Sequence, residues 1–308
     1  MIKTYSLLSH LDRLDMVFDH IEMVWNDRNG SLGIRDYLNE KVPLIQSEKI
    51  KGVMLYKDDR LAGVGWVDIG DLCYGSMMFH HLEEGVETEL VISLLDLGLL
   101  DGVLVELLTF WEEPGLIYRD ILEANGFFGN YRQRMALDLK KPYFFDADFS
   151  GVRFETLTTD LLPISSRISL AAHQYSLDQK HAPDLDHYEG RLALAQHICS
   201  GKFGEVLDSS SLLMWRGEDP IGFILVVAIK CWGLDKVPWV FDVCVDPKYI
   251  GQGYGKKLFC KSLGALTQLE YSFFGLSVTN SNTIAKYLYE KCGFFKVDEF
   301  VEYTRLKL

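Results

Sequence analysis

Apolar residues along the chain fall into short runs that are separated by turn residues or by segments of helical period. Two pairs of apolar runs, each joined by a charged turn, predict β-hairpins at residues 51–67 and 211–224. Further along, an apolar strand at 239–245 precedes an amphipathic helix, and a strand beginning at Leu276 precedes a helix that starts near Asn282. Short strands mixed with amphipathic helices predict an α/β fold built on a mixed sheet.

The final part of the chain has a counterpart earlier in the sequence. Near the C-terminus a helix ends at Gly293, and an alternating strand follows at 299–306. Earlier, a helix ends at Gly126, and an alternating strand follows at 132–139. The two glycines are 293 − 126 = 167 residues apart, which is about one domain length. The sequence therefore predicts two tandem copies of one fold.

Length and composition agree with two globular domains. The chain has 308 residues, of which 48% are hydrophobic and only 8 are prolines, and a domain usually takes about 150 residues. We place the domains at residues 1–145 and 146–308, with a linker at 140–151.

Three glycines at alternate positions, Gly251, Gly253 and Gly255, connect the strand at 239–245 to the helix that follows. Because glycine has no Cβ atom, successive backbone N–H groups can point into one concavity, and the N-terminus of the helix adds partial positive charge. The segment therefore predicts a pyrophosphate site.

The spacing of these glycines excludes two common phosphate loops. A Walker loop needs a glycine where Ile250 stands and a serine or threonine where Lys257 stands. The dinucleotide fingerprint needs a third glycine, but Lys256 and Leu258 occupy its two possible positions.

The segment from Ile250 to Gly255 instead resembles the acyl-CoA loop, [Q/R]xxGxG, of the GNAT superfamily of N-acetyltransferases. The segment from Leu276 to Phe295 is similar to the family's pattern of a strand, an asparagine, a helix with a tyrosine and a Gly-Phe pair. The resemblance implies two tandem GNAT-like domains, each a twisted, mostly antiparallel sheet flanked by helices. One departure is Ile250, which replaces the glutamine or arginine that contacts the phosphates.

The resemblance also implies an activity, namely transfer of an acetyl group from acetyl-CoA, as co-substrate, to a primary amine by direct attack in the domain 146–308. The strand before the loop is expected to splay from its neighbour, so that its backbone bonds the pantetheine and polarises the acetyl oxygen. The residues expected to contact acetyl-CoA are Val243, Cys244, Val245, Ile250, Gly251, Gln252, Gly253, Tyr254, Gly255, Lys256, Asn282 and Tyr289.

Tyr289 stands where the family commonly places its general acid. A phenol with an ordinary pKa of about 10 can protonate a departing thiolate. The alternative is a core tyrosine, because Ala285, Leu288 and Cys292 share its helical face. Asn282 begins the same helix and can cap it as well as contact the cofactor.

Asp242 is the candidate general base, since a charge inside an apolar strand needs a reason. The alternatives are a paired structural aspartate, or a water chain that makes a protein base unnecessary. Its neighbour Cys244 is interpreted as an inert core thiol rather than a nucleophile.

The first copy lacks the features of the second. At the loop position, residues 77–87 carry one glycine and three carboxylates, which would repel a pyrophosphate. With the offset of 167, Gly115 corresponds to Asn282 and Leu122 to Tyr289. We interpret the first copy as catalytically inactive, serving to shape or cover the acceptor site.

Charge and local composition limit the partners. A net charge of −13 argues against nucleic acid or an anionic membrane, and is compatible with a cationic acceptor such as a protein lysine or N-terminus, a polyamine or an aminoglycoside. By the resemblance, residues 169–188 correspond to the first helices of the family's fold, which usually line the acceptor cleft. Their histidines and aspartates have no HxH or HxxxH spacing, so we expect a solvated acidic loop facing the acceptor, and no metal. A monomer or a homodimer is expected.

The sequence also indicates where in the cell the protein is expected. The N-terminal residues are too polar for a signal peptide, no apolar run suits a membrane helix, and the 6 cysteines form no CxxC pair. We expect a cytoplasmic protein; the alternative is secretion into a host cell without a cleaved signal.

Three alternatives for the kind of protein remain open. The chain resembles, in size and layout, the tandem-domain acetyltransferase effectors that intracellular bacteria inject into host cells. A small-molecule acetyltransferase similar to mycothiol synthase is a second possibility. A CoA-binding sensor or scaffold without turnover is the third, favoured by Ile250.

Overall fold

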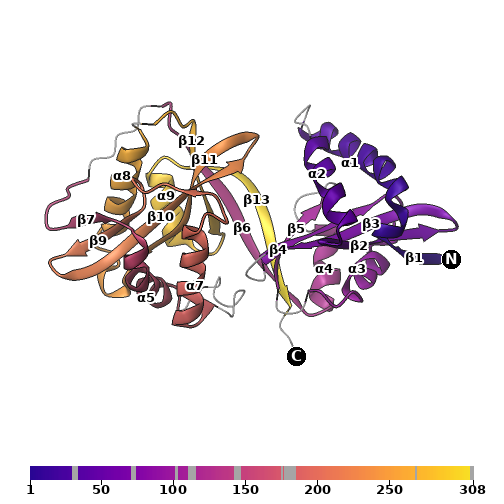
Figure 1. Ribbon diagram of the computed structural model, residues 1–308, viewed down its shortest axis with the longest axis horizontal. Coiled ribbons are helices and arrows are strands. Elements are labelled where there is room, and N and C mark those ends of the chain that lie inside the picture. Colours follow the sequence, from indigo (N-terminus) through magenta and orange to yellow (C-terminus); the bar gives the residue numbers. More distant parts are fainter. Residues whose placement is uncertain are drawn as a thin grey trace. The chain divides into compact units, whose positions relative to one another are not determined.

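The computed structural model describes residues 1–29, 34–70, 74–100, 103–109, 116–141, 147–174, 176, 185–267 and 269–305. The chain forms two compact units (Figure 1). Unit 1 comprises Met1–Asn130 together with Phe300–Leu308, and unit 2 comprises Tyr131–Glu299. None of the helices in the described ranges is long and apolar enough to span a membrane.

Unit 1 is a mixed sheet with helices on both faces. Its elements are β1 (Ile2–Ser6), the 3₁₀ helix η1 (Leu7–Arg13), α1 (Leu14–Asn29), α2 (Arg35–Gln46), β2 (Ile50–Lys57), β3 (Arg60–Ile69), β4 (Tyr74–His81), α3 (Glu87–Leu95), β5 (Leu104–Thr109), α4 (Leu116–Ala124), the start of β6 (Phe127–Asp138) and the end of β13 (Phe295–Arg305). The strand order is β1-β2-β3-β4-β5-β13. One core packs α3 and α4 against the sheet, and the other packs α1 and α2 against the opposite face.

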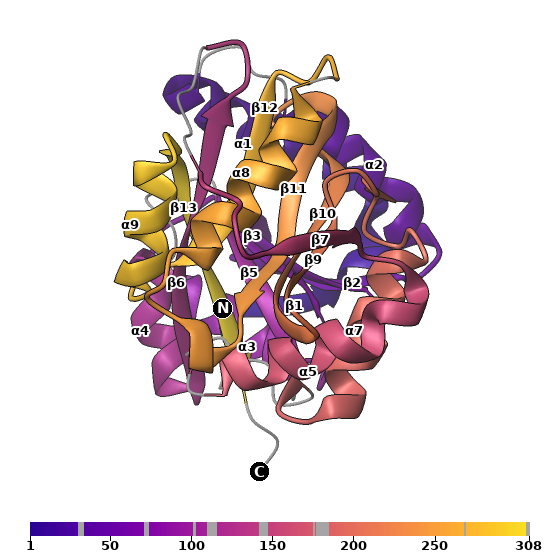
Figure 2. The same ribbon diagram turned by 90° about the vertical axis from the view of Figure 1, so that its left-hand side faces the viewer.

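Unit 2 repeats this architecture. Its elements are the rest of β6, β7 (Arg153–Thr156), the 3₁₀ helix η3 (Thr159–Leu161), α5 (Leu162–His173), α7 (Tyr188–Cys199), β8 (Glu205–Val206), β9 (Leu212–Arg216), β10 (Asp219–Cys231), β11 (Leu234–Val245), the 3₁₀ helix η5 (Pro247–Tyr249), α8 (Tyr254–Leu266), β12 (Phe273–Thr279), α9 (Thr283–Lys291) and the start of β13. The strand order is β7-β9-β10-β11-β12-β6, and β8 also pairs with β10. Helices α8 and α9 cover one face of the sheet, and α5 and α7 cover the other (Figure 2).

Strand directions confirm the predicted mixed sheets. In each unit the first four strands pair antiparallel, the fourth and fifth pair parallel, and the last pairs antiparallel with the fifth. The predicted hairpins are β2–β3 and β9–β10. The two repeat glycines, Gly126 and Gly293, both follow a helix with φ of 83°, a left-handed conformation that favours glycine at a helix C-terminus.

The last strand of each sheet comes from the other copy of the repeat. Strand β6 follows α4 of unit 1, but its residues 132–138 pair with β12 of unit 2. Strand β13 follows α9 of unit 2, but its residues 302–304 pair with β5 of unit 1. The compact units therefore differ in their bounds from the contiguous stretches 1–145 and 146–308 that we expected. Part of the expected linker, residues 142–146, lies outside the described residues.

Both exchanged strands contribute to the cores they join. In unit 1, Val301 is 1% exposed within the core that holds α3 and α4. In unit 2, Met135 and Leu137 of β6 lie in the core beneath α8 and α9. A chain cut at the predicted linker would consequently remove core residues from both units.

We expect Val301→Ala to destabilise unit 1 by about 2 kcal/mol, because it deletes two methyl groups from a filled core. Hydrogen exchange should show faster exchange at the amides of β5 and α4. Val297→Ala is the matched control on the same strand, since Val297 is 42% exposed and its truncation should cost less than about 0.5 kcal/mol. Faster exchange confined to β12 and α9 in the Val301 variant would contradict the assignment of this strand end to unit 1.

Candidate functional site

Strand β11 separates from β12 partway along its length. Leu225 of β10 is opposite Asp242, but the next residue, Val226, is opposite Val240, so Phe241 is the extra residue of a β-bulge. The parallel pairing of β11 with β12 is limited to two positions, Trp239 with Gly275 and Val240 with Leu276. Beyond the bulge, the edge of β11 that faces β12 leaves the ladder. The expected splay is confirmed.

The corresponding strands of unit 1 stay joined. Strand β4 pairs with β5 at six consecutive positions, from Tyr74 opposite Leu104 to Phe79 opposite Thr109. The register of β3 with β4 has no shift, and Met78 occupies the register position that Asp242 has in unit 2. Over the residues that the structure describes, strands β4 and β5 therefore show neither the bulge nor the opening that it produces.

The glycine loop of unit 2 lies between η5 and α8. Gly251 and Gly253 both have φ of 81°, and Gly253 is the N-cap of α8. The first bond of the helix runs from the Lys257 N–H to the Gly253 carbonyl at 3.2 Å, so the backbone N–H groups from Gly251 to Lys256 precede the helical ladder.

Open space adjoins the loop at two of its glycines. A Cβ atom added at Gly251 or Gly253 would have no atom within 4 Å. Gly255 has a different role, because a Cβ there would lie 3.2 Å from Leu288 Cδ2, so this glycine allows α8 and α9 to pack closely. The loop thus fits a phosphate-bearing ligand that lies against the backbone. The Ile250 side chain is 56% exposed, and its predicted place at the cofactor stays a prediction.

The loop of unit 1 at this position is shorter. Five residues, 82–86, join β4 to α3, whereas eight residues, 246–253, join β11 to α8. The first turn of α3 carries Glu87 and Glu89. Leu122, the counterpart of Tyr289, is fully buried on α4, and Gly115, the counterpart of Asn282, lies outside the described residues.

Helix α9 begins at Asn282 and carries Tyr289. The Asn282 Oδ1 atom accepts the Ala285 N–H at 3.1 Å, which confirms the predicted N-cap. Tyr289 is 7% exposed, and its ring meets Phe259 and Phe294 at centroid distances of 5.3 and 6.0 Å. The ring is therefore a core element, and the acid role of its hydroxyl stays a prediction.

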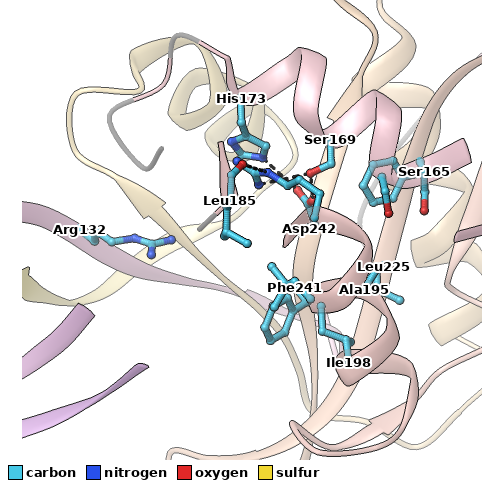
Figure 3. A pocket seen from close by; sticks show the side chains of 14 residues that line it. Arg132, Ser165, Ser169, His173, Leu185, Ala195, Ile198, Leu225, Phe241 and Asp242 are labelled. Carbon is cyan, nitrogen blue, oxygen red and sulfur yellow. Dashed lines mark hydrogen bonds and ion pairs between the residues drawn. The ribbon is translucent and has the colours of Figure 1, made fainter. Parts of the chain in front are cut away.

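Asp242 lies in a buried polar cluster that joins β11 to α5. Its Oδ2 accepts the Ser169 hydroxyl at 2.8 Å, and its Oδ1 is 3.3 Å from His173 Nε2 (Figure 3). The same Oδ1 accepts the Cys244 thiol at 3.2 Å. Arg191 of α7 extends the cluster by donating from Nη1 to Ser169 Oγ at 3.4 Å and from Nε to the Leu185 carbonyl at 2.8 Å.

The cluster keeps Asp242 ionised. Burial alone would raise the pKa of this carboxyl, but the hydrogen bond and charge of His173, the Ser169 hydroxyl and the Arg191 charge together lower its pKa to about 2. Burial raises the pKa of the Cys244 thiol well above its ordinary value, and the Asp242 charge raises it further. Cys244 therefore stays a neutral thiol, in agreement with the predicted inert role.

A cavity of about 170 Å³ adjoins this cluster on the face of the sheet that α5 and α7 cover. Its polar lining includes Ser165, Ser166, Ser169, His173, Arg191 and Asp242. Arg132 extends towards it from β6, and Phe241 of the bulge lies on its wall (Figure 3). The cavity therefore brings charged and hydroxyl groups next to the splayed strand.

His173 is the functional candidate that the sequence did not single out. We expected helices in the region 169–188, and helix α5 does extend to His173. The expectation of a solvated loop is wrong for His173, which faces Asp242. Ser169 and His173 are four residues apart and thus share a helical face, which is a local signal of the cluster. Residues 175 and 177–184 of that region lie outside the described residues.

The atoms of His173, Asp242 and Cys244 that could hold a metal lie within 4.8 Å of one another. Asp242 bonds the other two groups and also the Ser169 hydroxyl. The expectation that no metal takes part stays a prediction.

Part of unit 2 is similar in sequence to known proteins. Residues 174–294 match the model of the acetyltransferase (GNAT) family, and this stretch is a GNAT acetyltransferase domain. A segment of 58 residues is 40% identical to the [ribosomal protein bS18]-alanine N-acetyltransferase of Haemophilus ducreyi; it covers 19% of this chain and 40% of that relative's length.

Solved structures extend the similarity of fold to the whole chain. A GCN5-related N-acetyltransferase from Sphaerobacter thermophilus aligns over 100% of this chain and 96% of its own, with a TM-score of 0.63 and 15% identity. A tandem GNAT protein from the clavulanic acid biosynthesis pathway aligns over 98% of both chains, with a TM-score of 0.54 and 12% identity. These matches confirm the predicted tandem GNAT fold.

Proposed function

We propose that unit 2 transfers the acetyl group of acetyl-CoA to a primary amine in one direct step. The observation that carries this proposal is the bulge at Phe241, which opens β11 from β12 beside a glycine loop at the start of α8. The paired strands and shorter acidic loop of unit 1 support a single site in each chain.

Each part of this site has a role in the proposal. The N–H groups from Gly251 to Lys256 bind the diphosphate, and the free edge of β11 from Val243 to Val245 bonds the pantetheine and polarises the acetyl oxygen. The amine nitrogen attacks the acetyl carbon, the carbon–sulfur bond breaks, and the thiolate takes a proton from the Tyr289 hydroxyl. Asn282 contacts the cofactor in addition to capping α9.

The acceptor is a primary amine of a protein or a small molecule. The Haemophilus relative is named for acetylating an alanine of a ribosomal protein, which supports including a protein N-terminus among the candidates. The cytoplasmic location, and the alternatives of an injected effector and of a mycothiol-synthase-like enzyme, stay predictions.

A thiol-release assay tests the function. The full chain is incubated with acetyl-CoA and, in turn, a lysine peptide, a peptide with an N-terminal alanine, a polyamine and an aminoglycoside. We expect thiol release above the acceptor-free rate with at least one amine. Tight binding of acetyl-CoA without release on any acceptor would contradict this function and support the alternative of a CoA-binding sensor or scaffold.

A further inference from the structure

We propose that His173 is the general base of unit 2 and that Asp242 is the residue that positions it. This inference rests on the proposed function, and it changes the role that the sequence predicts for Asp242. His173 ends helix α5, lines the cavity beside the splayed strand, and holds its Nε2 atom 3.3 Å from Asp242 Oδ1.

Asp242 itself is poorly suited to accept the proton. Its two oxygens already take the Ser169 hydroxyl, the Cys244 thiol and the His173 ring. Its hydrogen bonds and charged neighbours lower its pKa, which makes the carboxylate a weak proton acceptor, whereas a general base works best when its pKa is near the operating pH. Imidazole is the side chain whose ordinary pKa lies in that range.

The geometry defines which nitrogen of His173 acts. An ionised carboxylate only accepts hydrogen bonds, so in the neutral ring the Nε2–H donates to Asp242 and Nδ1 keeps its lone pair. Nδ1 is 3.5 Å from Ser176 Oγ, at the outer limit of hydrogen bonding. As the new carbon–nitrogen bond forms, the proton of the amine moves to Nδ1, and the resulting imidazolium is stabilised by the Asp242 carboxylate.

The cavity gives the acceptor a place next to this pair. Ser166 is 2% exposed and lines the cavity, and its Oγ atom has no hydrogen-bond partner among the residues that the structure describes. A buried hydroxyl of this kind normally has a partner, so Ser166 points to a polar group of a bound molecule. The hydroxyl can therefore hold the acceptor while its amine meets His173.

The charged and titratable groups described around His173 come from three further elements. They are Asp242 and Cys244 on β11, Arg191 on α7 and Arg132 on β6. Arg191 is 6% exposed and helps to hold Asp242 in its charged form. The carboxylate that orients His173 is thus itself fixed by groups on two helices.

The test uses the full chain and the best amine of the thiol-release panel. We expect His173→Gln to lower kcat by about 10²- to 10⁴-fold, the usual yield of a positioned base, while the affinity for acetyl-CoA in calorimetry and the melting temperature barely change. The fall of kcat at low pH (the acidic limb of the kcat–pH profile), which wild-type protein should show, should be absent in this variant because the imidazole is gone. His187→Gln is the matched control, because His187 also contacts an aspartate, Asp186, at 2.9 Å, but is 53% exposed; its kcat should stay within about twofold.

Two further measurements separate a base from a structural histidine. Free imidazole should restore part of the activity of His173→Ala, because it can enter the space left by the ring. Asp242→Asn should lower kcat and move the acidic limb of the profile, since an amide cannot stabilise the imidazolium as a carboxylate does.

Different results would contradict this inference and the proposed function. A His173→Gln variant that keeps more than about a third of the wild-type kcat would overturn this inference and leave the proposed function intact. Loss of activity accompanied by equal loss of acetyl-CoA affinity, without rescue by imidazole, would also overturn it. A wild-type chain that releases no thiol with any amine would overturn the proposed function, and this inference with it.

Discussion

Gly253→Asp should lower the affinity for acetyl-CoA by at least about 100-fold, whereas Gly217→Asp should leave it unchanged. At Gly253 the new side chain enters the open space beside the N–H groups that precede α8, blocks the ligand and repels its diphosphate. The new carboxylate also interacts with the partial positive charge of the helix N-terminus and so competes with the diphosphate for it. Calorimetry on the full chain measures the effect.

Gly217 is a close control for the backbone. It lies in the same unit, at the turn between β9 and β10, with φ of 59° and no atom within 4 Å of an added Cβ. Both variants therefore place an aspartate in a left-handed conformation with open surroundings, but only Gly253→Asp changes the glycine loop. The wild-type chain should bind one acetyl-CoA. The placement of the acetyl-CoA site at this loop would be contradicted if Gly253→Asp kept an affinity for acetyl-CoA within about tenfold of wild type. Two equivalent acetyl-CoA sites per chain would also contradict it.

Tyr289→Phe should lower kcat by about 10²- to 10⁴-fold, the usual yield of a positioned acid. The change removes one hydroxyl and keeps the ring that contacts Phe259 and Phe294, so stability and acetyl-CoA affinity should barely change. The loss should appear equally in kcat and kcat/KM, because the interaction is made mainly in the transition state.

Tyr271→Phe is the matched control for this hydroxyl. Tyr271 is partly buried against the same core but has no role in the proposed chemistry, so its kcat should stay within about twofold. A loss under threefold in Tyr289→Phe, with chemistry shown to be rate-limiting, would return Tyr289 to a purely structural role.

Local features of the sequence predicted much of the fold. The hairpins, the glycines at 126 and 293 and the Asn282 cap depend on residues within a few positions of one another, where pattern and turn chemistry decide the outcome. The glycine loop followed from the same kind of argument. Splaying of β11 required the resemblance, because nothing in the residues around Phe241 marks a bulge.

Features that depend on distant residues were not predicted. His173 and Asp242 are 69 residues apart, and only the packing of α5 on the sheet brings them together. The side chain of Asp242 looked unpaired in sequence because Ser169 and Arg191 are also far from it along the chain. Exchange of the last strands could not be inferred, because it depends on which distant strand each one pairs with, β12 for β6 and β5 for β13.

The exchanged strands impose an order on the synthesis of the protein. Strand β5 of unit 1 gains its outer neighbour only when residues near Phe300 have been made, which is 300 − 130 = 170 residues after Asn130. At a ribosomal rate of 5–20 residues per second, the nascent chain waits about 10–30 s with that sheet edge uncovered. Unpaired edges invite pairing with other chains. Prolonged pausing or premature termination between the two halves of the message would consequently expose the nascent chain to aggregation, although every residue from Met1 to Asn130 had already been made.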